Sequence, residues 1–276
     1  MKMNAKLSAL VLSLGTCLFL GANANAQNSP NPKVLYVGDS IAVETADTVG
    51  WWSHNYSNST MTRAMFGGLA ICDFTQGKSS PDATDSSLTQ HVKEDKPDIV
   101  VLSFVGNRFT SCMQNLPDNE AYYNKYKSDA YEVARQVTEA AKAVGIKRPK
   151  IMWVLQGPWD NGHTTRMNKQ YREVAAASGD LVSDAGAEVS MAAYGTGNFA
   201  EQREIYTTVV PCSQFERDVG YCTDPVAGLA RVHKDSDGVH YCLGTVTNGS
   251  CDTNSPGILR YGMRIAGDIH NALMNP

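Results

Sequence analysis

The sequence predicts one α/β domain in which helices cover both faces of a parallel sheet of about five strands, a three-layer α/β/α sandwich. Two observations lead to this expectation. Strand-like and helix-like segments alternate along the chain. Most of the strand-like segments are also near-continuous apolar runs, as expected for strands that are buried on both faces. The 276 residues suffice for one domain with a substantial core.

Five strands and five helices are expected, in alternation. The strands are residues 33–38, 60–66, 98–105, 150–155 and, with a weaker pattern, 187–191. The helices are residues 41–52, 84–94, 119–144, 164–179 and 256–273. Ligands of such sheets bind beyond the carboxyl ends of the strands. The residues that directly follow each strand are therefore the candidates for a functional site.

Residues 1–26 have the pattern of a secretory signal peptide. Two lysines lie at its start, residues 7–20 form an apolar run, and Ala24-Asn25-Ala26 has the small-x-small pattern of a cleavage site after Ala26. The surroundings of Cys17 do not favour a lipid anchor, because the apolar run continues past it. We therefore expect a mature domain at residues 27–276, in the periplasm or outside the cell.

The charge balance points away from nucleic acid and from anionic membrane surfaces. Loss of the two signal-peptide lysines changes the formal net charge from −4 to −6, and the chain has no basic run. No later apolar stretch is long enough to span a bilayer. We expect a monomer without stable membrane insertion.

The cysteines predict a disulfide framework. Of seven in the chain, six remain after loss of Cys17, an even number in a protein that enters an oxidising compartment. Two pairs enclose short polar loops, and the remaining two cysteines would form a long-range bridge. The expected pairs are Cys212–Cys222, Cys242–Cys251 and Cys72–Cys112. A zinc site is less favoured, because the chain has no C-x-x-C pair.

The first predicted strand ends in Gly38-Asp39-Ser40. Ser40 would begin the next helix, where its hydroxyl lies near unpaired helical N–H groups and can face a pocket. The same triplet is also an ordinary turn with an N-cap residue. The interpretation of Ser40 as a nucleophile therefore depends on residues elsewhere in the chain.

The second and third predicted strands are followed by candidate hydrogen-bond donors. Gly67 and Gly68 follow the second strand and either form a tight turn or present a backbone N–H to an oxyanion. Asn107 follows Gly106 after the third strand and is either a turn residue or an oxyanion donor through its side-chain amide.

A candidate base lies near the C-terminus. A serine nucleophile needs a base, and His240 can accept its proton while Asp237, three residues earlier, orients the imidazole. An incidental surface turn has the same pattern. A metal site with His233 and Asp235 as further ligands is less favoured, and we expect no metal.

In chain order these motifs are Gly38-Asp39-Ser40, Gly68, Gly106-Asn107 and Asp237-x-x-His240. The set resembles the SGNH hydrolase superfamily (the GDSL-like esterases), over about residues 33–273. The cysteine-containing phrases after Asn107 and His240 are similar to the secreted branch that includes the SGNH domains of surface-glycan O-acyltransferases. Two motifs depart from the family pattern, since Ile41 replaces the Leu of GDSL and Arg108 follows Asn107.

The resemblance implies a flavodoxin-like sheet and a role for each motif residue. Ser40 would be the nucleophile, His240 the base and Asp237 its orienting acid. The oxyanion hole would consist of the backbone N–H groups of Ser40 and Gly68 and the side chain of Asn107, with Gly67 nearly as good a choice as Gly68. The implied reaction is acyl transfer to water without a metal or organic cofactor.

The substrate is expected to be a short-chain ester, such as an O-acetyl group on a carbohydrate. Aromatic residues that flank the predicted site would suit sugar rings, although two of them could equally close the first helix against the core. These residues are Trp51, Trp52, Tyr56, Trp159 and Tyr241. The expected substrate contacts are Asp39, Trp159 and Tyr241. Alternatives are a lipase or thioesterase, an acyltransferase, and a non-catalytic glycan-binding protein.

Overall fold

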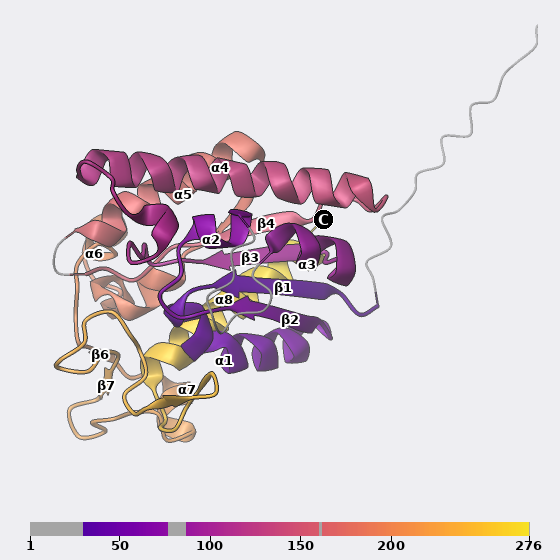
Figure 1. Ribbon diagram of the computed structural model, residues 1–276. Helices are drawn as coiled ribbons and strands as arrows, with labels where there is room; N and C mark the ends of the chain where they lie inside the picture. The colour runs from indigo at the N-terminus through magenta and orange to yellow at the C-terminus, as the bar shows by residue number, and fades with distance from the viewer. Residues whose placement is uncertain (1–29, 77–86, 160–161, 276) are drawn as a thin grey trace, which may run out of the picture.

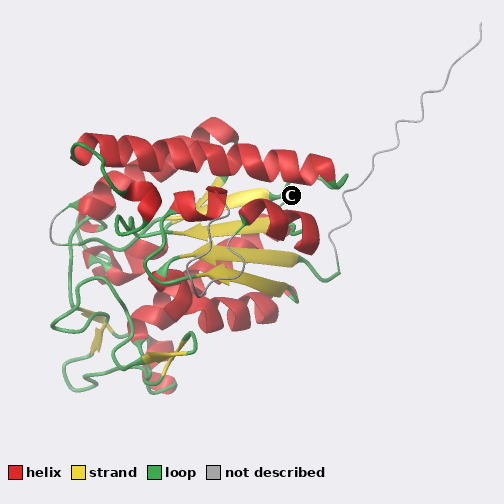
Figure 2. Cartoon of the chain, in the orientation of Figure 1, coloured by secondary structure: helices red, strands yellow, loops and turns green. Residues whose placement is uncertain are grey.

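A computed structural model of the chain describes residues 30–76, 87–159 and 162–275. Its centre is a five-stranded, all-parallel sheet with the order β2-β1-β3-β4-β5 (Figures 1 and 2). The strands are β1 (Lys33–Gly38), β2 (Thr60–Met65), β3 (Ile99–Ser103), β4 (Lys150–Val154) and β5 (Leu181–Ser183). This is the order of flavodoxin-like sheets, in which the chain reverses direction across the sheet between β1 and β3.

Helices cover both faces of the sheet, as predicted. Their bounds are α1 (Ser40–Ser57), α2 (Ile71–Gln76), α3 (Leu88–Asp95), α4 (Asn119–Ala143), α5 (His163–Ser178) and α8 (Pro256–Met274). Helices α1 and α8 pack against each other on one face, and α2 to α5 cover the other face (Figure 1). The predicted signal peptide and part of the predicted helix at 84–94 lie outside the described residues.

The continuous apolar runs of the strands are explained by burial on both faces. In β1, Leu35 and Val37 belong to the core beneath α2 to α5, whereas Val34 and Tyr36 belong to the core beneath α1 and α8. Successive strand residues point to opposite faces, so a strand between two helical layers needs an apolar residue at every position.

The segment after β5 forms a small irregular region at one end of the sheet (Figure 1). It contains α6 (Phe199–Gln202), β6 (Val209–Pro211), α7 (Gln214–Asp218), β7 (Leu229–Arg231), β8 (Val246–Thr247) and β9 (Ser250–Cys251). The cysteines are paired as the sequence predicts, Cys72–Cys112, Cys212–Cys222 and Cys242–Cys251. The last two disulfides lie in this region. Among the described residues, no helix has both the length and the hydropathy that a membrane crossing requires.

The prediction of a strand at residues 187–191 is wrong. This stretch forms 3₁₀ turns, and the fifth strand is the earlier β5. Helix α5 ends at Gly179, whose φ of 68° turns the chain, so the strand begins two residues later. Asp180 fixes this turn, because its carboxylate accepts hydrogen bonds of 2.6 and 2.8 Å from Arg148.

Helix α1 is longer than predicted, and this changes where its aromatic residues lie. It continues past residue 52 to Ser57. At 1.5 Å per residue, Trp51 and Tyr56 lie about 16 and 24 Å along the helix axis from Ser40. The expectation that Trp51, Trp52 and Tyr56 flank Ser40 is therefore wrong.

Candidate active site

Ser40 is the first residue of α1 and follows the carboxyl end of β1, which lies between β2 and β3 in the sheet. Asp39 caps the helix, because its Oδ1 accepts a hydrogen bond of 3.1 Å from the N–H of Ile41. Gly38 is required by the close approach of β3, since a Cβ there would lie 2.2 Å from the carbonyl oxygen of Ser103. These contacts place the Ser40 hydroxyl where the sheet order reverses.

Ser40, His240 and Asp237 form one chain of hydrogen bonds. Ser40 Oγ lies 2.9 Å from His240 Nε2, and His240 Nδ1 lies 2.9 Å from Asp237 Oδ2. Asp237 Oδ1 accepts the backbone N–H groups of Val239 and His240 at 3.0 and 3.1 Å. Partial burial raises the pKa of Asp237, but the hydrogen bonds from these N–H groups and the imidazole outweigh it and hold the pKa below its usual value.

A cavity of about 360 Å³ lies beside this chain, and we call it the Ser40 cavity. Its lining combines charged, polar and small apolar side chains. The described residues that line it are Ser40, Val43, Glu44, Gly67, Lys234, Asp237, His240, Cys242, Gly244, Thr245 and Val246.

The two glycines after β2 form a turn beside Ser40. The N–H of Leu69 donates to the carbonyl of Phe66 at 3.4 Å, and Gly68 between them has a φ of +80°. This is the third position of a type II turn, which requires φ above zero. Gly67 lines the Ser40 cavity, and a Cβ on it would lie 3.8 Å from the Cβ of Ser40. The turn is thus adjacent to Ser40, with Gly67 on the cavity side.

Asn107 also lies close to the Ser40 turn, but its amide is engaged. Its Nδ2 donates to Asp39 Oδ2 at 3.1 Å and to the carbonyl of Leu69 at 3.2 Å. Its own carbonyl accepts the hydroxyl of Tyr126 at 2.7 Å. An amide NH₂ has two hydrogens, so both are used within the protein in this state.

Asp39, expected to contact substrate, is instead fully buried. Its Oδ2 accepts the N–H of Val105 at 2.7 Å in addition to the amide of Asn107. Burial raises the pKa of Asp39 to about 7, against the hydrogen bonds from Val105 and Ile41. Asp39 therefore joins the turn that contains Ser40 to the segment after β3, and the expectation of a substrate contact is corrected.

Of the two expected aromatic contacts, Tyr241 is corrected by its burial, and Trp159 is half-buried and stays a prediction. Tyr241 is buried, and its hydroxyl accepts the N–H of Gly157 at 3.3 Å. Trp159 stacks on the ring of His163, with centroids 5.1 Å apart. The described residues that line the Ser40 cavity include neither aromatic side chain. The segment after β4 lies directly against the Tyr241 ring, since a Cβ on Gly157 would be 2.6 Å from the Tyr241 hydroxyl.

Glu44 has a position that the sequence analysis missed. It lies one helical turn after Ser40, is buried, and accepts the backbone N–H groups of Tyr241 and Cys242 at 2.9 and 3.1 Å. Burial raises its pKa to about 7, against the hydrogen bonds from these two N–H groups. Helix α1 thus fixes both Ser40 and the segment directly after His240. The available signal was an acidic residue at i+4 from Ser40, on the helix face that points inward.

His233 and Lys234 fix the same loop from its other side. His233 is buried, which lowers its pKa to about 4, so the ring is neutral at pH 7 and lies with Nδ1 3.1 Å from the carbonyl oxygen of His240. Lys234 Nζ donates to the carbonyl of Gly244. The Cys242–Cys251 disulfide begins two residues after His240.

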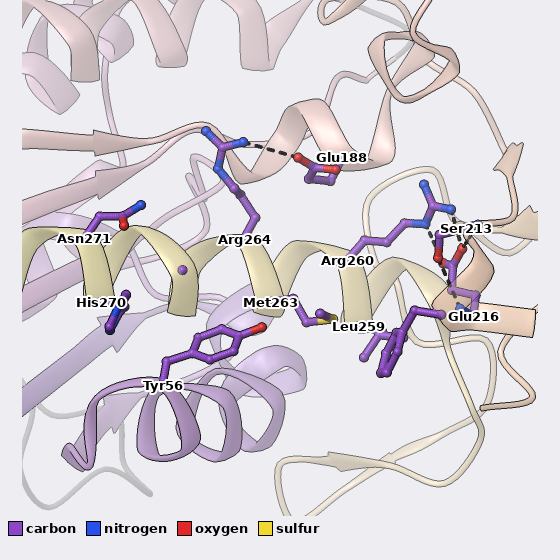
Figure 3. A pocket seen from close by; sticks show the side chains of 12 residues that line it. Tyr56, Glu188, Ser213, Glu216, Leu259, Arg260, Met263, Arg264, His270 and Asn271 are labelled. Atoms are coloured by element: carbon purple, nitrogen blue, oxygen red, sulfur yellow. Dashed lines mark hydrogen bonds and ion pairs between the residues drawn. The ribbon is translucent and has the colours of Figure 1, made fainter. Parts of the chain in front are cut away.

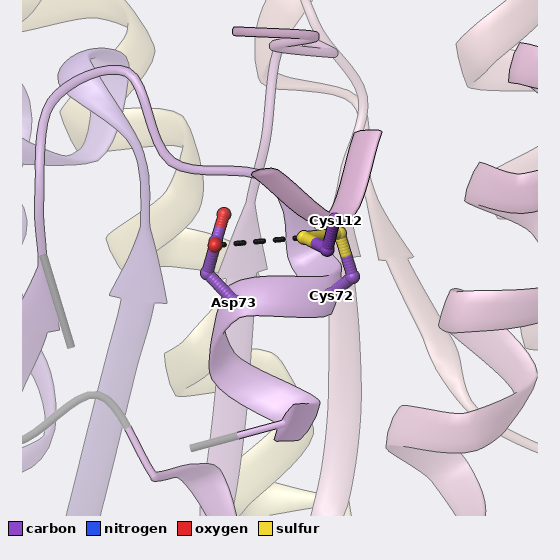
Figure 4. Close-up of side chains that lie close together, drawn as sticks. All are labelled: Cys72, Asp73 and Cys112. Atoms are coloured by element: carbon purple, nitrogen blue, oxygen red, sulfur yellow. Dashed lines mark hydrogen bonds between the residues drawn. A yellow bond between two sulfur atoms is a disulfide. The ribbon is translucent and has the colours of Figure 1, made fainter. Parts of the chain in front are cut away.

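The donor sets that could suggest a metal do not fit one. Cys72 and Cys112 lie beside Asp73 (Figure 4), but their sulfurs are bonded to each other and offer no thiolate. One oxygen of Asp73 accepts the N–H of Ala70 at 2.8 Å.

The four residues weighed as metal ligands near the C-terminus are committed to other partners. Asp237 and His240 are hydrogen-bonded to each other, and Nδ1 of His233 faces a backbone carbonyl. Asp235 forms an ion pair with Arg231. The geometry of this loop suits proton transfer between side chains.

Comparison with solved structures finds similarity to SGNH hydrolases and carbohydrate esterases. A Slackia heliotrinireducens protein described as an SGNH hydrolase is 20% identical, over 57% of this chain and 80% of that chain, with a TM-score of 0.40. A Desulfitobacterium hafniense protein described as lipolytic and of the G-D-S-L family is 15% identical, over 58% and 79%, with a TM-score of 0.39. A catalytic mutant of an acetylxylan esterase from Geobacillus stearothermophilus is 17% identical, over 56% and 77%, with a TM-score of 0.37.

The chain matches no family model and no curated protein. At these TM-scores, the similar structures assign neither an activity nor a substrate to this chain. The chain is similar to solved SGNH hydrolases, the superfamily that its motif order resembles.

Proposed function

We propose that this protein is a carboxylic ester hydrolase that uses Ser40 as nucleophile, His240 as base and Asp237 as orienting acid. One observation supports this above all others. Two consecutive contacts of 2.9 Å join the three side chains, at the sheet position where such folds bind ligands and beside a cavity. A serine hydroxyl is a weak nucleophile until a base accepts its proton, and this geometry supplies the base.

In the proposed reaction, Ser40 Oγ attacks the ester carbonyl carbon while His240 Nε2 accepts the hydroxyl proton. The tetrahedral intermediate collapses, and His240 gives this proton to the leaving alcohol, which leaves an acyl-serine. Water, deprotonated by His240, then attacks the acyl carbon and releases the acid with regeneration of Ser40. Asp237 stabilises the imidazolium that forms in each half-reaction.

The proposed oxyanion donors surround Ser40. As the first residue of α1, Ser40 has an N–H without an acceptor inside the helix. The Gly67–Gly68 turn would supply a second N–H; the motif order favours Gly68 as the donor, whereas Gly67 is the one that lines the Ser40 cavity. Asn107 is the third donor in the proposal, and it can serve only if its amide releases the Leu69 carbonyl when substrate binds.

The lining of the Ser40 cavity supports a short acyl group on a hydroxyl-rich molecule. Glu44, Lys234 and Thr245 provide polar atoms around a space of about 360 Å³, and Val43 and Val246 provide small apolar contacts. A long acyl chain would need a larger apolar tunnel than this lining offers. We propose an O-acetyl group on a carbohydrate as the substrate.

We also propose that the protein is exported. The stretch at residues 1–26 has the signal-peptide pattern, and three disulfides support an oxidising destination.

The test is release of p-nitrophenol from acetate, butyrate and longer p-nitrophenyl esters by disulfide-bonded protein. Fast acetate cleavage that declines with chain length, and that Ser40→Ala and His240→Ala reduce by at least about 1,000-fold, is expected. Preference for long chains would favour a lipase. Turnover that survives both substitutions would contradict the proposed catalytic residues, and glycan binding without acid release would favour a binding protein.

A further inference from the structure

A second cavity, of about 580 Å³, lies along helix α8 (Figure 3). Its walls come from the second half of α1, from α7 and from the turn at residues 185–189. The described residues that line it are Tyr56, Glu188, Ser213, Phe215, Glu216, Leu259, Arg260, Met263, Arg264, Gly267, His270 and Asn271. None of these residues lines the Ser40 cavity.

One wall of the second cavity is aromatic and continues onto the protein surface. Tyr56 and Phe215 line the cavity and are 38% and 39% exposed. Trp52 lies between them, with its ring 5.2 Å from that of Tyr56 and 5.8 Å from that of Phe215. Trp51 packs edge-on against Trp52 and is 58% exposed. Four contiguous rings at a surface, which we call the aromatic strip, indicate a binding face.

The other wall is polar and electrically balanced. In Figure 3, Arg264 and Glu188 lie across α8 from Tyr56 and form an ion pair at 3.3 Å. Arg260 forms an ion pair with Glu216 at the other end of the cavity. Arg264 also pairs with Asp268 at 2.9 Å. Both arginines of the lining are thus paired with acids, so a phosphate would find no unpaired positive charge.

This combination selects for a neutral, hydroxyl-rich ligand with an apolar face. Sugar rings have such a face, formed by their C–H groups, which packs on aromatic rings. Their hydroxyls can bond to the planar groups of Arg264 and Glu188, whose side chains are 42% and 37% exposed, and to the amide of Asn271. A lipid headgroup or nucleotide would instead need the charge excess that this cavity lacks.

We propose that the second cavity and the aromatic strip bind a neutral polysaccharide chain, separately from the catalytic centre. The identity of this chain as the acylated substrate rests on the proposed function. Because the strip lies about 16–24 Å along α1 from Ser40, a polymer held there keeps its ester groups at a high local concentration near Ser40. A small ester gains nothing from this second contact.

The test compares Trp51→Ala/Tyr56→Ala with a matched control, Tyr131→Ala, which removes a similarly exposed ring (40%) from α4. Binding is measured in the Ser40→Ala background by affinity electrophoresis in acetylated xylan, deacetylated xylan and glucomannan. Hydrolysis of p-nitrophenyl acetate and of acetylated xylan is measured with Ser40 intact. Circular dichroism and thermal unfolding check that each variant is folded.

We expect the double variant to bind at least one of these polysaccharides at least about tenfold more weakly, and to lose a similar factor on acetylated xylan. Hydrolysis of p-nitrophenyl acetate should stay within about twofold, and Tyr131→Ala should behave as the parent. Unchanged binding by the double variant, or no binding of the parent to any of the three polymers, overturns the proposal. The proposal is also overturned if the parent sediments as a dimer and the double variant as a monomer, because the aromatic strip would then be a contact between two copies of the chain.

The outcomes separate this inference from the proposed function. Binding that depends on the aromatic strip, in a protein without esterase activity, would retain the second site and reject the proposed catalysis. Esterase activity, in a protein whose polysaccharide binding does not depend on the aromatic strip, would retain the proposed catalysis and reject the second site.

Discussion

The carboxylate of Glu44 accepts the backbone N–H of Tyr241 at 2.9 Å, which ties the helix that begins with Ser40 to the residue that follows His240. Its second oxygen accepts the N–H of Cys242. The separation of Ser40 Oγ and His240 Nε2 thus depends on a buried acid that lies in the same helix as the serine.

Substitution of this acid tests its positioning role. In Glu44→Gln, the amide NH₂ would face one of the two backbone N–H groups and repel it, so the His240 loop should shift. We expect kcat for p-nitrophenyl acetate to fall about 10–100-fold with KM changed less than about threefold. The pH profile of kcat/KM should change as well. Steady-state kinetics from pH 5 to 9 measure both.

Glu188→Gln is the control, because this acid lines the second cavity and not the Ser40 cavity. Loss of thermal stability in Glu44→Gln with unchanged kcat and pH profile would mean that Glu44 only stabilises the fold.

The buried acids predict how stability depends on pH. Burial raises the pKa of Asp39 and of Glu44 to about 7, above the values in an unfolded chain. In the range between those values, the folded state binds more protons than the unfolded state, so the free energy of unfolding falls as pH rises through about 5 to 7. His233, whose pKa burial lowers to about 4, acts in the opposite direction below pH 6.5.

Urea unfolding at several pH values measures this effect. From pH 5 to pH 8, the free energy of unfolding of the wild type should fall relative to that of Glu44→Gln by on the order of 2 kcal/mol. A difference that is constant across this range would show that Glu44 has an ordinary pKa in the folded protein.

The close approach of β1 and β3 predicts that Gly38 tolerates no side chain. A Cβ at Gly38 would lie 2.2 Å from the Ser103 carbonyl oxygen and 2.5 Å from the Cβ of Ala42. Gly38→Ala should therefore lower the free energy of unfolding by at least about 2 kcal/mol, because the strand or helix must move. At Gly67 the nearest atom to a Cβ would be 3.8 Å away, so Gly67→Ala should fold normally. Equal stability of the two variants in urea would refute this.

The position of Asn107 predicts that its substitution lowers kcat and leaves KM nearly unchanged. If its amide moves from the Leu69 carbonyl to the oxyanion during the reaction, Asn107→Ala should lower kcat about 100–1,000-fold with little change in KM. Asn107→Asp has the same shape without the donor and should lose a similar factor. A variant with nearly normal kcat would leave the oxyanion to the backbone N–H groups of Ser40 and the glycine turn.

The sheet and its flanking helices could be predicted because their signals are local. The apolar runs at 33–38 and 150–155 correspond to β1 and β4, and the helix expected at 119–144 corresponds to α4. The fifth strand could not be placed by the same rule. It has three residues and is fixed by the local turn at Gly179 and by the Arg148–Asp180 ion pair, whose partners are 32 residues apart.

The site residues also differ in whether a local sequence motif marks them. Ser40, Asp237 and His240 could be proposed from the sequence because each lies in a short motif, and the structure brings their side chains into contact. Glu44 has no motif, and a glutamate in a helix usually faces solvent. Asp39 was identified for the wrong reason, since its position in the motif reflects helix capping and the contact with Asn107.

The Cys242–Cys251 disulfide has a consequence for when this protein becomes active. It fixes the chain just beyond His240, so the alignment of the proposed base depends on a bond that forms only under oxidising conditions. A newly made chain in a reducing compartment would have the right residues but a looser loop around them. If the protein is the exported esterase that we propose, its activity would then appear only after oxidation, once the chain had left the compartment of its synthesis.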